Sequence, residues 1–225
     1  MVKAVLFDMD GVIVDSEPFH WEVNRRIFKT LGINVSDEEY CRYIGVSNAA
    51  MWTSIKRNHG LAQAVGQLVE MQVSGNIDFM KNERVDPVEG VIDLVVGLKM
   101  KGLLLAVASS SPNRIIEMVL EKFDLRRFFD GIVSGEDVKN GKPAPDIFLA
   151  AAAMLKVLPE WCVVIEDATH GVEAAKAAGM KCIGLRSIHS PGQQLGKADL
   201  VVSDLKALAV SDVLSLASSS ETTEA

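Results

Sequence analysis

Near its start the chain reads Ala4-Val5-Leu6-Phe7-Asp8-Met9-Asp10-Gly11-Val12. The apolar run at its beginning is of the kind that forms a fully buried parallel strand, and two carboxylates follow it almost at once. Comparable apolar runs recur along the chain, and helical patterns separate most of them. Strands that alternate with helices predict a doubly wound α/β fold with a parallel sheet. The other strands are expected at residues 103–108, 131–133, 162–165, 182–185 and 200–202.

Residues 17–84 break this alternation, because they contain helical patterns and no convincing strand. They predict an all-helical insert after the first strand. Ser36 followed by Glu39 is typical of a capping box at the start of one of its helices. The helices of the insert are expected near residues 21–31, 37–43, 48–58 and 61–80. The predicted organisation is a core segment at residues 1–15, a helical cap at 16–86, an α/β core at 87–216 and a disordered polar tail at 217–225.

The chain carries 30 acidic and 23 basic residues, a net charge of -7. This balance argues against nucleic acid or an anionic membrane as the main partner. No apolar run approaches the ~20 residues that a membrane span requires, and the apolar start is too short for a signal peptide. Cys41, Cys162 and Cys182 lack metal-ligand spacing, and the last two are expected as buried thiols. We therefore expect a cytoplasmic protein.

Asp8 and Asp10 form a pair of carboxylates just beyond the first strand. In a doubly wound sheet this position faces the crevice where ligands bind. Two such carboxylates are costly to ionise together unless a cation neutralises them, and Mg²⁺ prefers oxygen ligands. One carboxylate could then attack phosphorus while the other handles a proton. An Asp-x-Asp pair by itself is more often an acidic loop at a strand end without a catalytic role. Whether this pair is catalytic therefore depends on the other segments of the chain.

Three further segments follow predicted strands. Ser109-Ser110-Ser111-Pro112-Asn113 leads into a helix, whose N-terminus can bind an anion, and we expect Ser109 to serve the ligand while Ser111 caps the helix. Lys142 stands before Pro143 in a loop ahead of another helix, where it can place a fixed positive charge beside a phosphate. Glu166-Asp167 is a second acidic pair at a strand end, suited to complete a metal site opposite Asp8.

In this order and context, the segments Asp8-x-Asp10-Gly11, Ser109, Lys142-Pro143 and Glu166-Asp167 resemble the haloacid dehalogenase superfamily, in the branch whose helical cap follows the first motif. The resemblance implies a Rossmann-like core and phosphoryl transfer. It implies that Asp8 is the nucleophile and Asp10 the general acid/base, while Ser109 and Lys142 bind the transferring phosphoryl group. It also implies Mg²⁺ held by the carboxylates of Asp8 and Asp167 and the backbone carbonyl of Asp10, with Glu166 nearby or ligating.

Within that superfamily the chain is more similar to β-phosphoglucomutases and sugar-phosphate phosphatases. The similarity rests on Asp15-Ser16-Glu17-Pro18 with His20, on residues 142–148 and on the cap loop Gly45-Val46-Ser47. It implies that substrate is a small phosphorylated metabolite, such as a sugar phosphate, and that the protein is a monomer. The substrate-binding residues that it implies are His20, Gly45, Val46, Asn48, Ser110 and Asn113.

The choice between phosphatase and mutase depends on cations for a second phosphate. The mutases have an arginine where this chain has Asn48, and a lysine where it has Pro112. These two missing cations favour a phosphatase. A β-phosphoglucomutase-type phosphohexomutase stays open as an alternative, since Arg42, Lys56 or Arg57 could compensate. A non-catalytic binding or regulatory protein is a remote alternative, because such proteins usually have a damaged motif and none of these motif residues is replaced.

Overall fold

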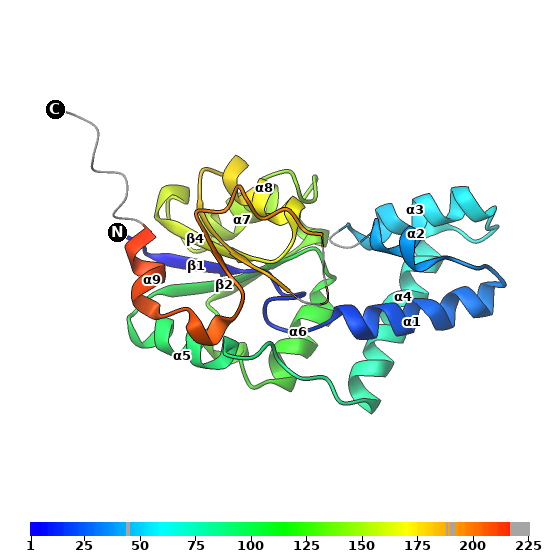
Figure 1. The fold of residues 1–225 in the computed structure, drawn as a ribbon, viewed down its shortest axis with the longest axis horizontal. Coiled ribbons are helices and arrows are strands. Elements are labelled where there is room, and N and C mark those ends of the chain that lie inside the picture. The colour runs from blue at the N-terminus through cyan, green and yellow to red at the C-terminus, as the bar shows by residue number, and fades with distance from the viewer. Residues whose placement is uncertain (44–45, 188, 190–191, 217–225) are drawn as a thin grey trace.

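The computed structural model describes residues 1–43, 46–187, 189 and 192–216, with the side chain of Glu17 left out. These residues form a six-stranded parallel sheet in the order β3-β2-β1-β4-β5-β6, with helices on both faces (Figure 1). The predicted α/β fold is therefore confirmed. The strands are β1 (Ala4–Phe7), β2 (Leu104–Ser109), β3 (Gly131–Ser134), β4 (Cys162–Glu166), β5 (Lys181–Leu185) and β6 (Leu200–Val202).

The central strand β1 is buried along its whole length. Its side chains alternate between two apolar clusters, as the period of a strand requires. Val5 and Phe7 belong to the cluster that includes α5, α6 and α9, whereas Ala4 and Leu6 belong to the one that includes α7 and α8. Because both faces are covered, the strand is apolar throughout. The helices are α5 (Val91–Met100), α6 (Asn113–Lys122), α7 (Asp146–Met154), α8 (Thr169–Ala177) and α9 (Val210–Ser215).

Four helices in succession follow β1 and lie beyond one end of the sheet (Figure 1). They pack around a small apolar core of their own, in which Trp52 and Ile55 are fully buried. The side chain of Ser36 accepts a hydrogen bond from the backbone N–H of Glu39, which confirms the serine half of the predicted cap. The helices are α1 (Glu17–Leu31), α2 (Asp37–Cys41), α3 (Asn48–His59) and α4 (Val65–Asn82).

Two chain crossings connect these helices to the sheet, and they run side by side. Val14, on the way out, forms a bridge with Pro87, on the way back. The backbone N–H of Val88 donates to the carbonyl of Ile13 at 3.0 Å. The division at residues 15/16 and 86/87 remains a prediction, and the predicted disordered tail at 217–225 lies outside the described residues.

Strand order decides which chain segments meet at the site. Phe7 on β1 is in register with Ile165 on β4 on one side and with Val107 on β2 on the other. The residues that follow these strands therefore emerge together at the carboxyl edge of the sheet. This is the place where an α/β sheet of this topology binds ligands.

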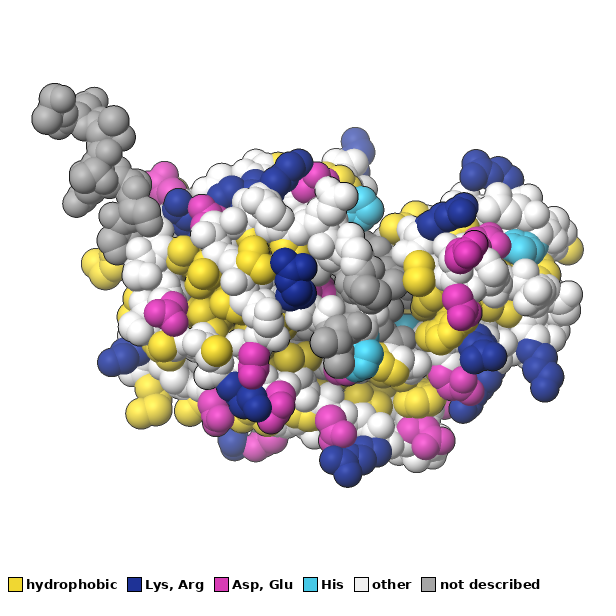
Figure 2. All heavy atoms as spheres, in the orientation of Figure 1, with side chains coloured by type: hydrophobic (Ala, Val, Ile, Leu, Met, Phe, Trp, Pro, Cys, Tyr) yellow, Lys and Arg dark blue, Asp and Glu magenta, His cyan; other side chains and the backbone are white. Residues whose placement is uncertain are grey.

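The surface shows no strong segregation of charge on the face drawn in Figure 2, where acidic and basic side chains are interspersed. No helix in the described part of the chain is long and apolar enough to cross a membrane. Cys162 and Cys182 are buried, as predicted, whereas Cys41 is exposed. Burial raises the pKa of both buried thiols, so neither is poised as a nucleophile.

Candidate active site

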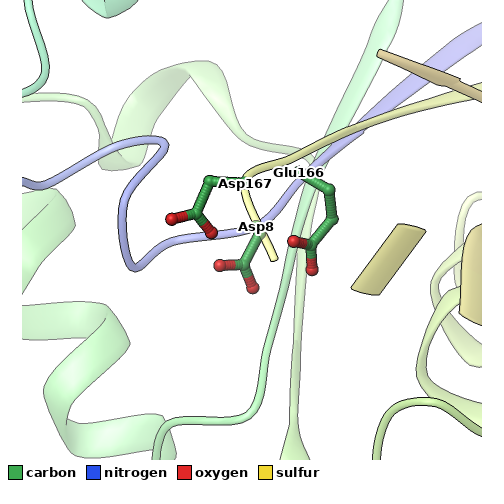
Figure 3. A group of neighbouring side chains, drawn as sticks. All are labelled: Asp8, Glu166 and Asp167. Atoms are coloured by element: carbon green, nitrogen blue, oxygen red, sulfur yellow. The ribbon is translucent and has the colours of Figure 1, made fainter. Parts of the chain in front are cut away.

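Three carboxylates meet at the carboxyl edge of the sheet. Asp8 follows β1, while Glu166 ends β4 and Asp167 follows it, and their side chains converge (Figure 3). One oxygen from each lies within 4.8 Å of the others, and all three residues are buried. Glu166 and Asp167 are 158 and 159 positions from Asp8 in the sequence, yet the fold brings their side chains together.

Lys142 is the cation beside this cluster. Its Nζ lies 2.5 Å from Oδ1 of Asp8 and 2.6 Å from Oε1 of Glu166, and its side chain is 5% exposed. Nζ also donates to the carbonyl of Ala108 at 3.2 Å. Burial alone would lower the pKa of Lys142, but the two carboxylates outweigh it and raise the pKa, so the ammonium stays charged. Lys142 therefore fixes the orientation of the Asp8 carboxylate.

The cluster holds more negative charge than Lys142 can balance. Burial, together with the charges of Glu166 and Asp10, raises the pKa of Asp8 to about 8 against the opposing effect of Lys142. Three buried carboxylates beside one ammonium fit a hard divalent cation, whose charge would let Asp8 ionise at neutral pH. Carboxylate oxygens are also the donors that Mg²⁺ prefers, so the residues present fit the metal that the sequence implies.

Two glycines make room for this cluster. A Cβ at Gly11, where φ is +77°, would collide with the carboxylate of Asp167. A Cβ at Gly171, in the first turn of α8, would collide with the carboxylate of Glu166. Sequence reasoning missed the role of Gly171. A glycine inside a helix is the signal that could have indicated a close approach.

Asp10 is held from two sides. His20 on α1 contacts its Oδ1 through Nε2 at 3.0 Å, and Ser111 donates from Oγ to its Oδ2 at 2.8 Å. Burial would raise the pKa of Asp10, but the hydrogen bond and charge of His20, with the bond from Ser111, lower it to about 2. In this state Asp10 is an ionised carboxylate at neutral pH.

The expected capping role of Ser111 is wrong. Helix α6 begins at Asn113 with Pro112 before it and has no side-chain cap, because the hydroxyl of Ser111 is bonded to Asp10 instead. Ser109 is fully buried, and its Oγ accepts a hydrogen bond from the backbone N–H of Ser111 at 3.1 Å. Ser109 therefore shapes the loop, and it is not among the described residues that line the pocket.

A pocket opens between the acidic cluster and the helices α1 to α4. From the core it is lined by the catalytic candidates Asp8, Asp10 and Lys142 and by Ser110, Ser111, Glu166, Asp167 and Ala168. From the helical part it is lined by His20, Tyr40, Tyr43, Val46, Ser47, Asn48, Met51 and Gln72.

The structure brings most of the predicted substrate-binding residues to this pocket. His20, Val46, Asn48 and Ser110 line it, whereas Gly45 lies outside the described residues. Asn113 is not part of the described lining. Its backbone N–H donates to Glu136 and its side chain to Asp137, so these acidic residues hold it away.

Tyr40, Tyr43 and Gln72 line the pocket without having been singled out from the sequence. Tyr40 lies on α2, Tyr43 just after it and Gln72 on α4, with no common motif, and only the packing of these segments gathers them. None of the three basic residues that could have replaced the missing cations lines the described pocket. Lys56 instead donates to the carbonyls of Leu61 and Gln63 at 2.6 and 2.9 Å.

Comparison with known proteins agrees with this geometry. The sequence model of the family described as haloacid dehalogenase-like hydrolase matches residues 5–185. Hexitol phosphatase B of Escherichia coli (strain K12) is 32% identical over 218 residues, which cover 95% of this chain and 97% of that enzyme. The crystal structure of β-phosphoglucomutase from Clostridium difficile has a TM-score of 0.84 at 26% identity and covers 97% of this chain and 98% of that one.

One relative is much longer than this chain. Protein SUPPRESSOR OF QUENCHING 1, chloroplastic, of Arabidopsis thaliana is 35% identical over 221 residues. The match covers 95% of this chain but only 21% of that protein. The chain thus spans about a fifth of the length of that relative.

Proposed function

The chain belongs to the family of haloacid dehalogenase-like hydrolases, and from this premise we propose that it is a Mg²⁺-dependent phosphatase of a small sugar or sugar-alcohol phosphate. The reaction passes through an aspartyl-phosphate on Asp8. The observation that carries the proposal is the buried contact of Lys142 with Asp8 and Glu166, beside a third carboxylate. This arrangement gives an aspartate fixed orientation and strong charge stabilisation, which are what phosphoryl transfer needs from a protein.

In the first step an oxygen of Asp8 attacks phosphorus, and the bond from phosphorus to the leaving-group oxygen breaks. Asp10 gives that oxygen a proton, so the alcohol leaves neutral. In the second step water attacks the phosphorus of the aspartyl-phosphate and gives its proton back to Asp10. Inorganic phosphate is released, and both carboxylates return to their starting state.

Asp10 must be protonated to serve as the acid in the first step. Its pKa of about 2 leaves it ionised in the resting protein. A bound phosphate dianion is a like charge close to Asp10, and a like charge raises the pKa of a carboxyl group. Substrate binding therefore favours the protonated acid that the first step requires, while His20 and Ser111 hold the carboxyl group in place.

Mg²⁺ would be held by the carboxylates of Asp8 and Asp167, the backbone carbonyl of Asp10 and Glu166, directly or through water. It would supply positive charge to the oxygens of the transferring phosphoryl group. Lys142 contacts Asp8, and the hydroxyl of Ser109 is proposed to donate to the transferring phosphoryl group. The protein's own contribution is to keep these charges fixed among buried side chains.

The residues that the helical part contributes to the pocket lining favour a phosphatase over a mutase, because they offer few positive charges. A mutase must bind two phosphates, yet His20 is the one basic residue that α1 to α4 contribute to the described lining, and it is bonded to Asp10. The similarity to β-phosphoglucomutase keeps the mutase as the second candidate. A non-catalytic role is less well supported. Such proteins usually have a damaged motif, whereas here none of the motif residues is replaced.

The test is phosphate release with Mg²⁺ from a panel of hexose, pentose and polyol phosphates, with isomerisation of β-glucose 1-phosphate assayed in parallel. We expect steady release from one or a few sugar phosphates, and its loss in Asp8→Asn. Conversion to glucose 6-phosphate with little free phosphate would instead show a mutase. A monomeric state and a cytoplasmic location stay part of the proposal, to be checked by light scattering and by fractionation of the source cells.

A further inference from the structure

Gln72 is a buried polar residue at the edge of the pocket. It lies on α4, is 3% exposed, and belongs to the lining on the side away from the acidic cluster. A buried amide is costly unless its hydrogen bonds are satisfied. The hydrogen bonds that the Gln72 amide makes within the protein indicate which of its groups remains for a ligand.

Trp52 fixes the orientation of the Gln72 amide. The indole Nε1–H of Trp52 donates to Oε1 of Gln72 at 2.8 Å. An indole N–H can only donate, so the atom that faces it must be the carbonyl oxygen of the amide. Trp52 is fully buried and comes from α3, which packs beside α4, so it cannot easily move away.

The amide nitrogen is the half of the group that remains available. Within the described part of the chain, Nε2 of Gln72 makes no hydrogen bond, yet it is not among the buried polar atoms that lack a partner. It therefore keeps contact with solvent, and the pocket is the hollow that Gln72 lines. Two N–H hydrogens are available there for an acceptor.

The surroundings indicate the kind of acceptor. The neighbouring lining from the helical part consists of Tyr40, Tyr43, Ser47, Asn48 and Met51, which are neutral and partly apolar. A second phosphate would find no cation in this part of the described lining. An uncharged hydroxyl oxygen is the group that an oriented amide donor and neutral walls suit best.

We propose that Gln72, positioned by Trp52, is a specificity-determining residue that donates a hydrogen bond to a hydroxyl of the substrate's leaving group. The inference rests on the proposed function, since it assumes that a phosphorylated polyol binds with its phosphate at Asp8. It adds the residue in the helical wall of the pocket that recognises this neutral polyhydroxylated leaving group. Gln72 does not touch the reacting atoms.

The test compares substrates with and without hydroxyl groups. Sorbitol 6-phosphate, mannitol 1-phosphate, glucose 6-phosphate and fructose 1-phosphate form the hydroxylated set, and p-nitrophenyl phosphate is the probe without hydroxyls. The variants are Gln72→Met, which keeps size but removes the donor, and Trp52→Phe, which frees the amide to rotate. Gln63→Met is the matched control, because Gln63 lies outside the described pocket lining.

In Gln72→Met we expect kcat/KM for the best hydroxylated substrate to fall about tenfold, while p-nitrophenyl phosphate stays within about twofold of the parent. Trp52→Phe should shift the same ratio in the same direction by a smaller factor. Gln63→Met should leave the ratio unchanged. The parent protein should turn over a deoxy analogue, which lacks the hydroxyl that Gln72 binds, more slowly than the full substrate. In Gln72→Met the two substrates should have similar kcat/KM, because the deoxy analogue and the variant each remove the same hydrogen bond.

Equal losses on both kinds of substrate in Gln72→Met would overturn the inference, since they indicate a structural role alone. Hydrolysis of p-nitrophenyl phosphate without any activity on the hydroxylated set would also overturn it and leave phosphoryl transfer intact. The proposed function itself fails under a different result, in which Asp8→Asn retains activity on p-nitrophenyl phosphate.

Discussion

The hydroxyl of Ser111 donates to Oδ2 of Asp10 across 2.8 Å, although the residues are 101 positions apart in the chain. His20 contacts the other oxygen of the same carboxylate at 3.0 Å. Ser111 belongs to the loop after β2, whereas His20 lies on α1, in the helical part. The proposed acid/base is thus oriented jointly by the sheet and by the helices that cover it, and its alignment depends on both being in place.

Ser111→Ala should lower kcat by about tenfold, because a misaligned acid/base loses part of the contribution of proton transfer. The hydrogen bond from Ser111 lowers the pKa of Asp10, so its removal should raise that pKa. The alkaline limb of the pH–rate profile, where Asp10 loses the proton that the first step needs, should then move to higher pH. Steady-state kinetics across pH measures both effects. The exposed Ser203→Ala is the control. An unchanged alkaline limb in Ser111→Ala would contradict this role.

Lys142→Met should leave the carboxylates of Asp8 and Glu166 buried together without their cation. We expect a loss of about 3 kcal/mol in the free energy of unfolding without Mg²⁺, as for a broken buried ion pair. Activity should fall about a thousandfold, because the charge beside the phosphoryl group is lost. Urea denaturation and phosphate release measure the two. Lys139→Met, at an exposed position, should change neither, and a stable active Lys142→Met would rule out the proposed role.

Gly171→Ala should damage the site through a single methyl group, because that methyl overlaps the Glu166 carboxylate. Gly66→Ala is a matched control, since Gly66 also lies in a helix and its added Cβ meets nothing. We expect Gly66→Ala to stabilise the protein by about 0.5–1 kcal/mol through helix propensity. Gly171→Ala should instead destabilise it by about 1–3 kcal/mol and weaken Mg²⁺ binding. Equal melting temperatures for the two variants would refute the steric argument.

Binding of Mg²⁺ should depend on pH. The pKa of Asp8 in the metal-free fold is about 8, above its ordinary 3.8, so between these values the folded protein holds a proton that the unfolded chain releases. Stability without metal should therefore fall as pH rises from about 4 to about 8. Mg²⁺ must displace that proton, so its apparent affinity should rise by up to about tenfold per pH unit and level off near pH 8.

Titration calorimetry in buffers of different ionisation enthalpy measures this proton release directly. We expect close to one proton per Mg²⁺ below neutral pH and a decline towards alkaline pH. An affinity that does not change across this range, without proton release, would show that Asp8 is already ionised in the metal-free protein.

The fold could be predicted because its strands are continuous apolar runs, most of which are buried, although the edge strand β6 is only partly buried. Runs such as Ala4–Phe7 and Leu200–Val202 were assigned with the bounds that the structure shows, since a continuous apolar run has few other uses in a soluble domain. The other strands differ by one residue at one end, or at both ends in β2, and at most of these ends a polar residue such as Ser109 or Glu166 continues the ladder. At these ends the backbone hydrogen bonds of the sheet extend beyond the apolar run of the sequence.

The candidate site was predictable where residues follow strand ends, and not where packing decides. Asp8, Glu166 and Lys142 were found because each stands at a defined point of the alternating pattern. The hydroxyl of Ser111 was misassigned, because local capping looked sufficient and its distant partner could not be seen. Gln72 carries no sequence signal, since its position in the pocket depends on how α4 packs against α3.

The central claim is that the phosphoryl group is transferred to Asp8. The most direct measurement mixes the protein with Mg²⁺ and its best substrate, quenches in acid within one turnover, and analyses the peptide that contains Asp8 by mass spectrometry. We predict the mass of one added phosphoryl group on that peptide, lost in alkali and absent from Asp8→Asn. Steady phosphate release without any phosphorylated peptide, retained in Asp8→Asn, would show that water attacks the substrate directly and would contradict the claim.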